Sequence, residues 1–313
     1  MRLLAPAKVN LHLRVGPRDG SGYHPLLTWM CTVALFDTLT FRQHDGPDAP
    51  SSYPRATDDP IVLTCDDASI ACDDTNLVRR AARPLIELSG SAPHSPRLSR
   101  GLAIHLQKHI PVGGGLGGGS SDAARTLIGL NRLWSLDLPL AQLHAVATEV
   151  GSDVPFFLHG PSGVCSGRGQ LVAPAPVPRA RWALLVLSGF PVPTRDVYAK
   201  FDELRLGDVG FGEAHPPWQE WADLSAGPLL SRLRNDLEPA AFALVPQLGR
   251  LRDALELSLA RVIRMTGSGG TLFTLFDERR EAEVAAQFVR TRHMLEALAV
   301  EVAPTVVDDL SAS

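Results

Sequence analysis

The feature that most restricts the fold is a run of glycines between a predicted strand and a predicted helix. Six of the seven residues 113–119 are glycine, and two serines follow. Residues 101–110 alternate as a strand does, and helical spacing of apolar residues begins at about residue 121. Glycine has no side chain to keep a ligand from the backbone, and N–H groups at a helix N-terminus can converge on an anion. The run therefore predicts a phosphate-binding loop, because a flexible linker, the alternative, rarely joins two such regular elements.

The run alone leaves open which phosphate compound binds. Gly113, Gly115 and Gly118 satisfy the dinucleotide fingerprint G-x-G-x-x-G, but that fold also needs a second strand ending in an acid about twenty residues later. Asp137 has roughly that spacing, yet helix rather than strand is predicted before it, which disfavours a dehydrogenase. The sequence contains no Gly-Lys dipeptide, so a Walker P-loop is excluded.

Length and composition indicate a folded chain of about two domains. The 313 residues are 45% hydrophobic and 20% charged, and a domain usually has roughly 100–200 residues. The net charge of −4 argues against nucleic acid or an anionic membrane as a partner. The four cysteines are scattered, which favours reduced thiols over disulfides or zinc. Pro6 and Lys8 interrupt the start of the chain, so we expect no signal peptide, no membrane anchor and a cytoplasmic protein.

Strands and helices are predicted in both halves, which gives an α+β fold class. Strands are expected at 8–15, 26–40, 101–110, 182–187, 262–265, 271–276 and 298–302. Helices are expected at 76–88, 121–133, 140–149, 194–203, 228–234, 238–258 and 278–291. Three prolines between 174 and 178 indicate a boundary near 165–180, and hence domains at 1–170 and 171–313. Loops are expected at 43–60 and 90–100.

Three shorter signals have ordinary structural explanations when each is taken alone. The second glycine-rich segment, 266–270, would be a hairpin turn, and Asp153 would be an N-cap or a loop acid. Lys8 would be a surface lysine on strand 8–15, whose polar face also carries Asn10, His12 and Arg14. The chain has only three lysines against 27 arginines, which makes the position of Lys8 unusual.

The order of these motifs is more specific than any one of them. It resembles the signature series of the galactokinase, homoserine kinase, mevalonate kinase and phosphomevalonate kinase superfamily. The matching segments are 6–11, 111–124, 151–156 and 266–270. Gly22-Tyr23-His24-Pro25-Leu26, the helix start at 75–78 and the glycine run resemble one branch, the 4-diphosphocytidyl-2-C-methylerythritol kinases of non-mevalonate isoprenoid synthesis. The resemblance covers about residues 3–276 and is weak only in the loops 43–60 and 205–228.

The resemblance implies a two-domain kinase fold with the active site in the interdomain cleft. It implies that ATP phosphorylates an alcohol group, the 2-hydroxyl of 4-diphosphocytidyl-2-C-methyl-D-erythritol. Asp153 matches the family's acid, which accepts the proton of the attacking hydroxyl, and Lys8 matches a lysine near that acid and the transferred phosphoryl group. An aspartate near a lysine stays ionised at neutral pH, as a base must.

The resemblance also implies the binding residues. Backbone N–H groups of one loop would hold the triphosphate, and a hydroxyl of Ser120 or Ser121 could reach Mg²⁺ without any dedicated metal cluster. That loop consists of Pro111, Val112, Gly113, Gly114, Gly115, Leu116, Gly117, Gly118, Gly119, Ser120 and Ser121. On the acceptor side Tyr23 would stack on cytosine, His24 would read the edge of the base, and Asn10 would contact the substrate deeper in the cleft. Thr194 and Tyr198 would close the pocket. Gly270 departs from the pattern, because alanine or a similar small residue is expected there.

Two other functions stay open at this point. One is a kinase of the same superfamily for another hydroxyl, such as that of homoserine or mevalonate, against which Tyr23 and His24 argue. The other is a nucleotide-binding protein without turnover, against which Lys8 and Asp153 argue. In each case the partner is a small molecule, and the chain is expected to be a monomer or a homodimer.

Overall fold

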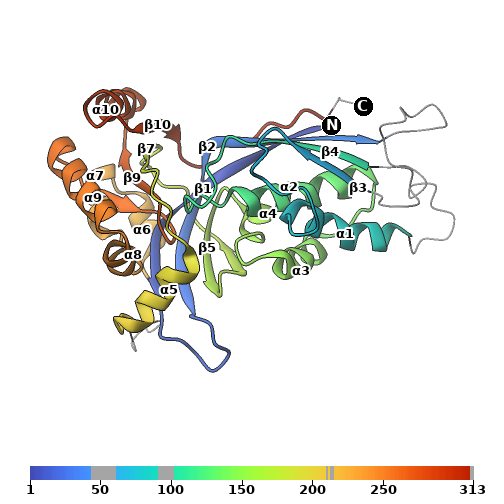
Figure 1. Cartoon of the computed structure of the whole chain (residues 1–313), viewed down its shortest axis with the longest axis horizontal. Coiled ribbons are helices and arrows are strands. Elements are labelled where there is room, and N and C mark those ends of the chain that lie inside the picture. The colour runs from blue at the N-terminus through green and yellow to red at the C-terminus, as the bar shows by residue number, and fades with distance from the viewer. Residues whose placement is uncertain (44–60, 91–101, 209–210, 212–214, 311–313) are drawn as a thin grey trace.

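The computed structural model describes residues 1–43, 61–90, 102–208, 211 and 215–310, and these contain two β-sheets flanked by helices (Figure 1). The first sheet has the order β3-β4-β2-β5-β6, with β1 paired to β2. Its strands are β1 (Arg2–Val15), β2 (Leu26–Gln43), β3 (Ile61–Cys65), β4 (Leu102–Gln107), β5 (Ser162–Gly167) and β6 (Leu171–Pro174). The second sheet has the order β10-β7-β9-β8. Its strands are β7 (Trp182–Leu187), β8 (Arg264–Met265), β9 (Thr271–Phe276) and β10 (Glu296–Glu301).

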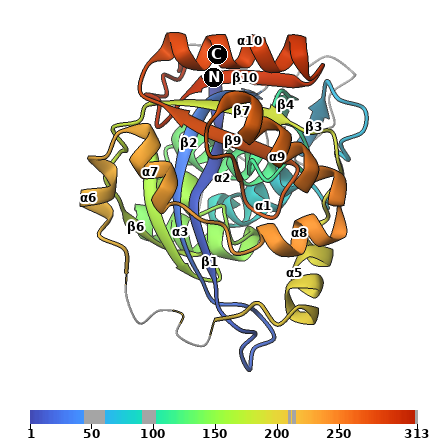
Figure 2. The same cartoon turned by 90° about the vertical axis from the view of Figure 1, so that its left-hand side faces the viewer.

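Four helices lie on one side of the first sheet, and six surround the second. The first group is α1 (Leu77–Gly90), α2 (Gly118–Leu133), α3 (Leu140–Val150) and α4 (Phe156–His159). The second group is α5 (Thr194–Glu203), α6 (Trp218–Ala222), α7 (Ala226–Arg232), α8 (Glu238–Leu244), α9 (Pro246–Leu259) and α10 (Arg279–Arg292). Figure 2 shows α10 lying over the second sheet. Helices and sheets in both halves confirm the predicted α+β class.

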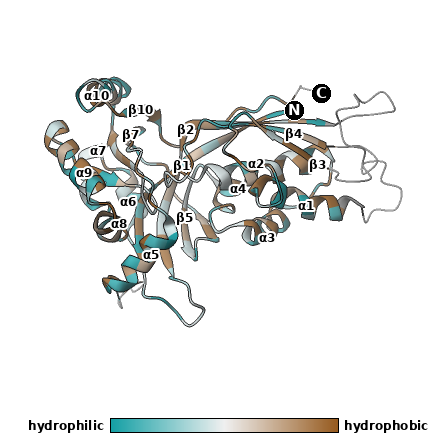
Figure 3. Cartoon of the chain, in the orientation of Figure 1, coloured by the Kyte–Doolittle hydropathy of each residue, from teal (hydrophilic) through white to brown (hydrophobic). Residues whose placement is uncertain are grey.

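Strand β1 runs through both halves of the molecule and takes part in every core. Leu3 packs with α1 and α2 in the first core, Leu11 packs with residues of β7 and β9 in the second, and Val15 belongs to the third. Figure 3 shows hydrophobic residues along the strands of both sheets and hydrophilic ones along α5. Residues of β1 are therefore fixed from both sides, which is the rigid support that a catalytic group needs.

Two irregularities in the β1–β2 pairing change which way side chains face. The register shifts between Pro6 and Ala7 and again between Asn10 and His12. Proline cannot donate a ladder hydrogen bond, and a bulge reverses the alternation of faces beyond it. The prediction that Lys8, Asn10 and His12 share one face is therefore wrong for His12. Lys8 and Asn10 line a cavity, whereas His12 packs against two tryptophans.

The predicted elements are present with some shifted ends. Strand β1 begins at Arg2 rather than residue 8, since residues 2–5 also pair with β2. The helix expected at 238–258 is two helices, because Pro246 begins α9 and proline suits the first turn of a new helix. The expected loop 205–228 contains α6 and the start of α7. Of the loop expected at 43–60 only Gln43 is described, and it ends β2. Of the loop expected at 90–100 only Gly90 is described, and it ends α1. The other residues of both loops lie outside the described part of the chain.

The division into domains at 1–170 and 171–313 stays a proposal. Residues 171–174 form β6, which pairs antiparallel with β5 in the first sheet. The second sheet begins with β7 at Trp182. We therefore propose the boundary in the connection 175–181, a few residues later than the sequence indicates.

His12 is a buried histidine in an aromatic environment. Its ring centroid lies 5.8 Å from that of Trp218 and 5.3 Å from that of Trp221. In the described part of the chain neither ring nitrogen has a hydrogen-bond partner. Burial, helped by nearby arginines, lowers the pKa of His12 from 6.5 to about 3. The folded protein therefore holds this imidazole neutral at pH values where the unfolded chain protonates it.

We expect the His12→Leu variant to lose less stability on acidification than the wild type. The unfolded chain binds the proton below pH 6.5 and the folded protein only near pH 3, so the free energy of unfolding falls as the pH drops through that window. Between pH 7 and pH 5 the His12 contribution is about 2 kcal/mol. Urea unfolding of both proteins at the two pH values measures the difference. The exposed His215→Leu variant should behave as wild type, and equal pH dependence in the His12 variant would contradict the expectation.

Candidate active site

A cavity of about 1170 Å³ contains almost every residue that the sequence singled out. Ser121 is the exception, because it is fully buried in the first turn of α2 and does not line the cavity. The lining includes Lys8, Asn10, Tyr23, His24, all of 111–120, Asp153, Thr194 and Tyr198. These residues come from β1 and the turn after it, from the glycine run, from the segment that precedes α4, and from helix α5. The chain thus brings together motifs that are more than a hundred residues apart.

Lys8 and Asp153 face each other in this cavity. The Lys8 Nζ lies 3.6 Å from Asp153 Oδ2 and donates a hydrogen bond of 2.5 Å to Asn10 Oδ1. The Lys8 side chain is 4% exposed and that of Asp153 is 38% exposed. Asn10 is held in turn, since its Nδ2 donates to Thr28 Oγ1 at 2.9 Å and its N–H donates to Thr266 Oγ1 at 2.9 Å. A fixed buried ammonium therefore points at a carboxylate that solvent or a ligand can reach.

The two glycine-rich segments contact each other beside this pair. The Lys8 N–H donates to Leu116 O at 2.9 Å, which joins the glycine run to β1. Gly115 has φ +76°, and a Cβ added there would lie 2.4 Å from the carbonyl oxygen of Thr266. Only glycine accepts both the left-handed backbone and this approach of two main chains. Segment 266–270 is therefore packed against the glycine run, and it is more than an isolated turn between β8 and β9.

Gly117 precedes α2 and touches the lysine. Its φ is +71°, and an added Cβ would lie 3.0 Å from Lys8 Cγ and 3.1 Å from Phe157 Cζ. Helix α2 begins at the next residue, so its free N–H groups and the positive end of its dipole face the cavity. This geometry is suited to bind the phosphates of a nucleotide.

The Gly117→Val variant is expected to weaken ATP binding at least about tenfold, because a branched side chain blocks both the backbone conformation and the approach of phosphate. Acceptor affinity should change far less. Calorimetric titration with ATP measures the effect. Gly227→Val in α7 is the matched control, since an added Cβ there meets no atom within 4 Å. Unchanged ATP affinity in the Gly117 variant would show that the run does not hold the triphosphate.

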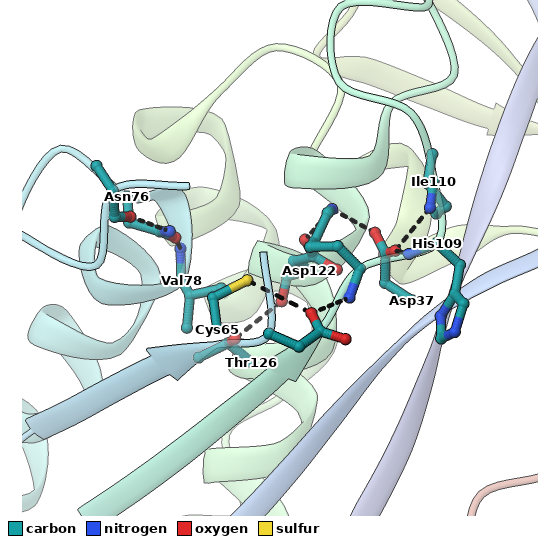
Figure 4. A network of polar contacts seen from close by, with 11 residues as sticks. Asp37, Cys65, Asn76, Val78, His109, Ile110, Asp122 and Thr126 are labelled. Atoms are coloured by element: carbon teal, nitrogen blue, oxygen red, sulfur yellow. Dashed lines mark hydrogen bonds and ion pairs between the residues drawn. The ribbon is translucent and has the colours of Figure 1, made fainter. Parts of the chain in front are cut away.

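A buried charged cluster supports both ends of the glycine run, and the sequence reasoning missed it. Lys108 Nζ pairs with Asp37 Oδ2 and donates to Asp122 Oδ2 at 2.9 Å, and all three side chains are at most 7% exposed. Asp37 Oδ1 also accepts the N–H groups of His109 at 2.6 Å and Ile110 at 2.8 Å (Figure 4). Burial raises the pKa of Asp122 above its usual range, although the ammonium of Lys108 opposes this. The one signal available was that Lys108 is one of only three lysines.

The opposite end of the cavity is aromatic. Tyr23 is 54% exposed, whereas His24 is buried and its Nδ1 lies 2.9 Å from the carbonyl oxygen of Gly16. The His24 Nε2 lies 3.3 Å from Asp202 Oδ1, and its ring centroid is 5.2 Å from that of Tyr198. Burial raises the pKa of the Tyr198 phenol. Asp202, which the sequence reasoning did not single out, therefore helps to fix the orientation of His24.

Known proteins similar to this chain agree with the motifs. The family model for the GHMP kinases N terminal domain matches residues 76–161, and that for GHMP kinases C terminal matches residues 218–294. A 4-diphosphocytidyl-2-C-methyl-D-erythritol kinase of Syntrophus aciditrophicus (strain SB) is 36% identical over 286 residues, which are 91% of this chain and 93% of that protein. The chain belongs to the 4-diphosphocytidyl-2-C-methyl-D-erythritol kinase family. Another member, from Synechococcus sp. (strain CC9605), is 37% identical over 289 residues, 88% of this chain and 87% of that protein.

Solved structures place the family within a wider fold. A crystal structure of 4-(cytidine 5'-diphospho)-2C-methyl-D-erythritol kinase has a TM-score of 0.74 at 32% identity and covers 97% of this chain and 100% of that chain. A mevalonate kinase with a TM-score of 0.71 is only 13% identical, covers 97% and 100% of the two chains, and shows the shared fold alone. The predicted superfamily, its branch and the kinase class of enzyme are confirmed.

Three further observations concern membranes, metals and thiols. None of the described helices combines the length and apolar character needed to cross a bilayer. Within the described ranges no group of three or more His, Cys, Asp or Glu residues is arranged to hold a metal ion. The four cysteines Cys31, Cys65, Cys72 and Cys165 are free thiols, and burial raises the pKa of Cys31 to about 12. A thiol with so high a pKa is chemically inert at neutral pH.

Proposed function

We propose that this member of the kinase family transfers the γ-phosphoryl group of ATP to the 2-hydroxyl of 4-diphosphocytidyl-2-C-methyl-D-erythritol, a step toward isoprenoid precursors. The observation that carries the proposal is one continuous cavity with the Lys8–Asp153 pair beside the glycine run and Tyr23 and His24 at its other end. Such a cavity suits a long acceptor whose base and reacting hydroxyl lie far apart. The names of the relatives support the same acceptor.

In the proposed reaction the acceptor hydroxyl oxygen attacks the γ-phosphorus, and the bond from that phosphorus to the bridging oxygen of ADP breaks. Asp153 takes the hydroxyl proton, a role that the accessibility of its carboxylate supports. Lys8 stabilises negative charge on the transferring phosphoryl oxygens. Asn10 accepts the hydrogen bond of the Lys8 ammonium and so holds it in position. This location supports a role for Asn10 in contacting the acceptor deep in the cavity.

The binding roles follow the two ends of the cavity. The N–H groups of residues 112–120 at the N-terminus of α2 would hold the triphosphate, whereas the N–H of Ser121, proposed from the sequence, already donates to Gly117 O at 2.9 Å. Tyr23 would stack on the cytosine ring, and His24 would hydrogen-bond its edge through Nε2, in place of the present contact of that atom with Asp202. Thr194 and Tyr198, both on α5, would close the acceptor end, and Thr194 Oγ1 already lies 2.7 Å from Ser268 Oγ.

Mg²⁺ fits this donor set through phosphate oxygens and a single hydroxyl, because it binds few protein ligands and keeps water or phosphate oxygens. Ser120 lines the cavity, whereas the Ser121 Oγ is enclosed and has no hydrogen-bond partner among the described residues. We therefore propose Ser120 rather than Ser121 as the hydroxyl that reaches the ion. When bound, Mg²⁺ would neutralise charge on the phosphates.

Location and assembly complete the proposal. We propose a cytoplasmic protein, supported by four free cysteine thiols. We also propose a monomer or a homodimer. All the residues assigned above lie around one cavity of a single chain, so the reaction itself needs no second copy.

An ADP-release assay with a panel of acceptors tests the proposed function. We expect turnover with the diphosphocytidyl polyol and little with 2-C-methyl-D-erythritol 4-phosphate, homoserine or mevalonate, because a site built to hydrogen-bond one edge discriminates against ligands that lack it. Efficient use of homoserine, mevalonate or the bare sugar phosphate would instead indicate another kinase of the superfamily. ATP binding without turnover of any acceptor would indicate a non-catalytic relative.

A further inference from the structure

The turn between β5 and β6 reaches into the cavity beside the proposed base. Gly167 and Gly169 have φ of +68° and +109°, and the N–H of Arg168 between them donates to Gln170 Oε1 at 2.7 Å. A Cβ added to Gly169 would lie 3.5 Å from Ser152 O and 3.7 Å from Asp153 Oδ1. The backbone of this tight turn therefore lies close to the Asp153 segment.

The side chain of Arg168 extends from this turn to the aromatic end of the cavity. Its guanidinium carbon lies 4.5 Å from the centroid of the Tyr23 ring, and both residues line the cavity. A guanidinium over an aromatic face is a favourable arrangement that limits the motion of both groups. Arg168 thus spans the stretch between Asp153 and Tyr23.

The charge of Arg168 is available to a ligand. Across the described residues it makes no ion pair with a carboxylate. Another cavity arginine, Arg18, is engaged differently, since its Nε donates to Gly22 O at 2.8 Å and so stabilises the turn that carries Tyr23. Arg168 is therefore a cavity cation that directly precedes Gly169, the residue beside Asp153, and whose guanidinium lies over the Tyr23 ring.

We propose that Arg168 binds the diphosphate of the acceptor and so helps to determine its specificity. The inference rests on the proposed function, in which the cytosine stacks on Tyr23 and the reacting hydroxyl lies at Asp153. In the acceptor the diphosphate joins these two parts, so it must follow the stretch that Arg168 spans. The planar guanidinium matches phosphate oxygens with two parallel hydrogen bonds, which a lysine ammonium cannot reproduce.

Binding of two acceptor fragments tests the assignment. Wild type and the Arg168→Gln and Arg168→Lys variants are titrated with cytidine and with cytidine diphosphate, while a saturating non-hydrolysable ATP analogue occupies the glycine run. We expect Arg168→Gln to weaken cytidine diphosphate binding by about tenfold or more and to leave cytidine within about twofold, since one charge-assisted contact is lost. The Lys variant should retain part of the affinity. Arg280→Gln, an exposed arginine of α10, should match wild type.

Two results would overturn the assignment. Equal weakening of both ligands would mean that Arg168 acts only by supporting Tyr23, and unchanged binding of both would mean that it does not contact the acceptor. Unchanged affinity for the ATP analogue checks that the variants are folded. Turnover of the complete acceptor by the wild type separates the role of Arg168 from the proposed function. If the wild type turns over the acceptor, either of the two results above rejects only the role of Arg168. If the wild type neither turns over the acceptor nor binds either fragment, the proposed function is rejected as well.

Discussion

We expect the Asp153→Asn variant to lower kcat by about 10²-fold or more and to leave ATP affinity nearly unchanged. The amide keeps the size of the side chain but cannot accept the proton of the acceptor hydroxyl, and loss of a general base usually costs this much. Asp153 lies outside the glycine run, and its ion-pair partner is Lys8 at 3.6 Å, so the proposed triphosphate site keeps its contacts. Steady-state kinetics gives kcat, and calorimetry gives the ATP dissociation constant.

The control for this prediction is another exposed aspartate. Asp253 on α9 pairs with its neighbour Arg252 and takes no part in the cavity, so Asp253→Asn should leave kcat unchanged. Turnover of the Asp153 variant within a factor of three of wild type would remove the proposed role of base. A large rise in the acceptor KM at constant kcat would instead make Asp153 a binding residue.

The site could be located from the sequence where its geometry depends on the residue type itself. Gly115 must be glycine because of its left-handed backbone and the 2.4 Å approach to Thr266, so a glycine run between a strand and a helix is a visible signal. Lys8 is also a visible signal, because the chain has only three lysines. The proximity of Lys8 and Asp153, however, came from the family resemblance, because no local pattern connects residues 145 positions apart.

The contacts that escaped prediction all join distant segments through ordinary residue types. Asp37 lies on β2 and reaches the backbone of His109, 72 residues away, and no spacing rule marks such a pair. Arg168 is one of 27 arginines, so nothing in the sequence distinguishes it from a surface residue. A buried carboxylate needs a partner, but which lysine supplies it is decided by the tertiary fold.

Where the predicted elements differ from the observed ones, the cause is local and physical. Residues 2–5 join β1 although Pro6 follows them, because a bulge accommodates the proline within the strand. The same kind of irregularity at Leu11 turned His12 away from the face of Lys8 and Asn10. The break at Pro246 could have been predicted, since proline removes a helical hydrogen bond and favours a helix start.

Replacing Lys8 by methionine should lower kcat by about 10²–10³-fold, because a cation directed at developing phosphoryl charge in a water-poor site contributes several kcal/mol to transition-state stabilisation. Methionine preserves most of the buried packing of a side chain that is 4% exposed, so loss of charge is the main change. Lys200→Met on α5 is the matched control, since Lys200 pairs only with Glu203 at 2.6 Å among the described residues and does not line the cavity.

The double variant of Lys8 and Asp153 decides whether the two groups act together. If Asp153 takes the proton while Lys8 stabilises the same transition state, the double variant should be little slower than the more impaired single variant, because residues that act as a unit are strongly non-additive. Single-turnover rates measure this without interference from product release. Independent, multiplicative losses in the double variant would assign the two residues to separate steps. A single Lys8 variant that changes only the acceptor KM would make the ammonium a binding group rather than a stabiliser of the transferred phosphoryl group.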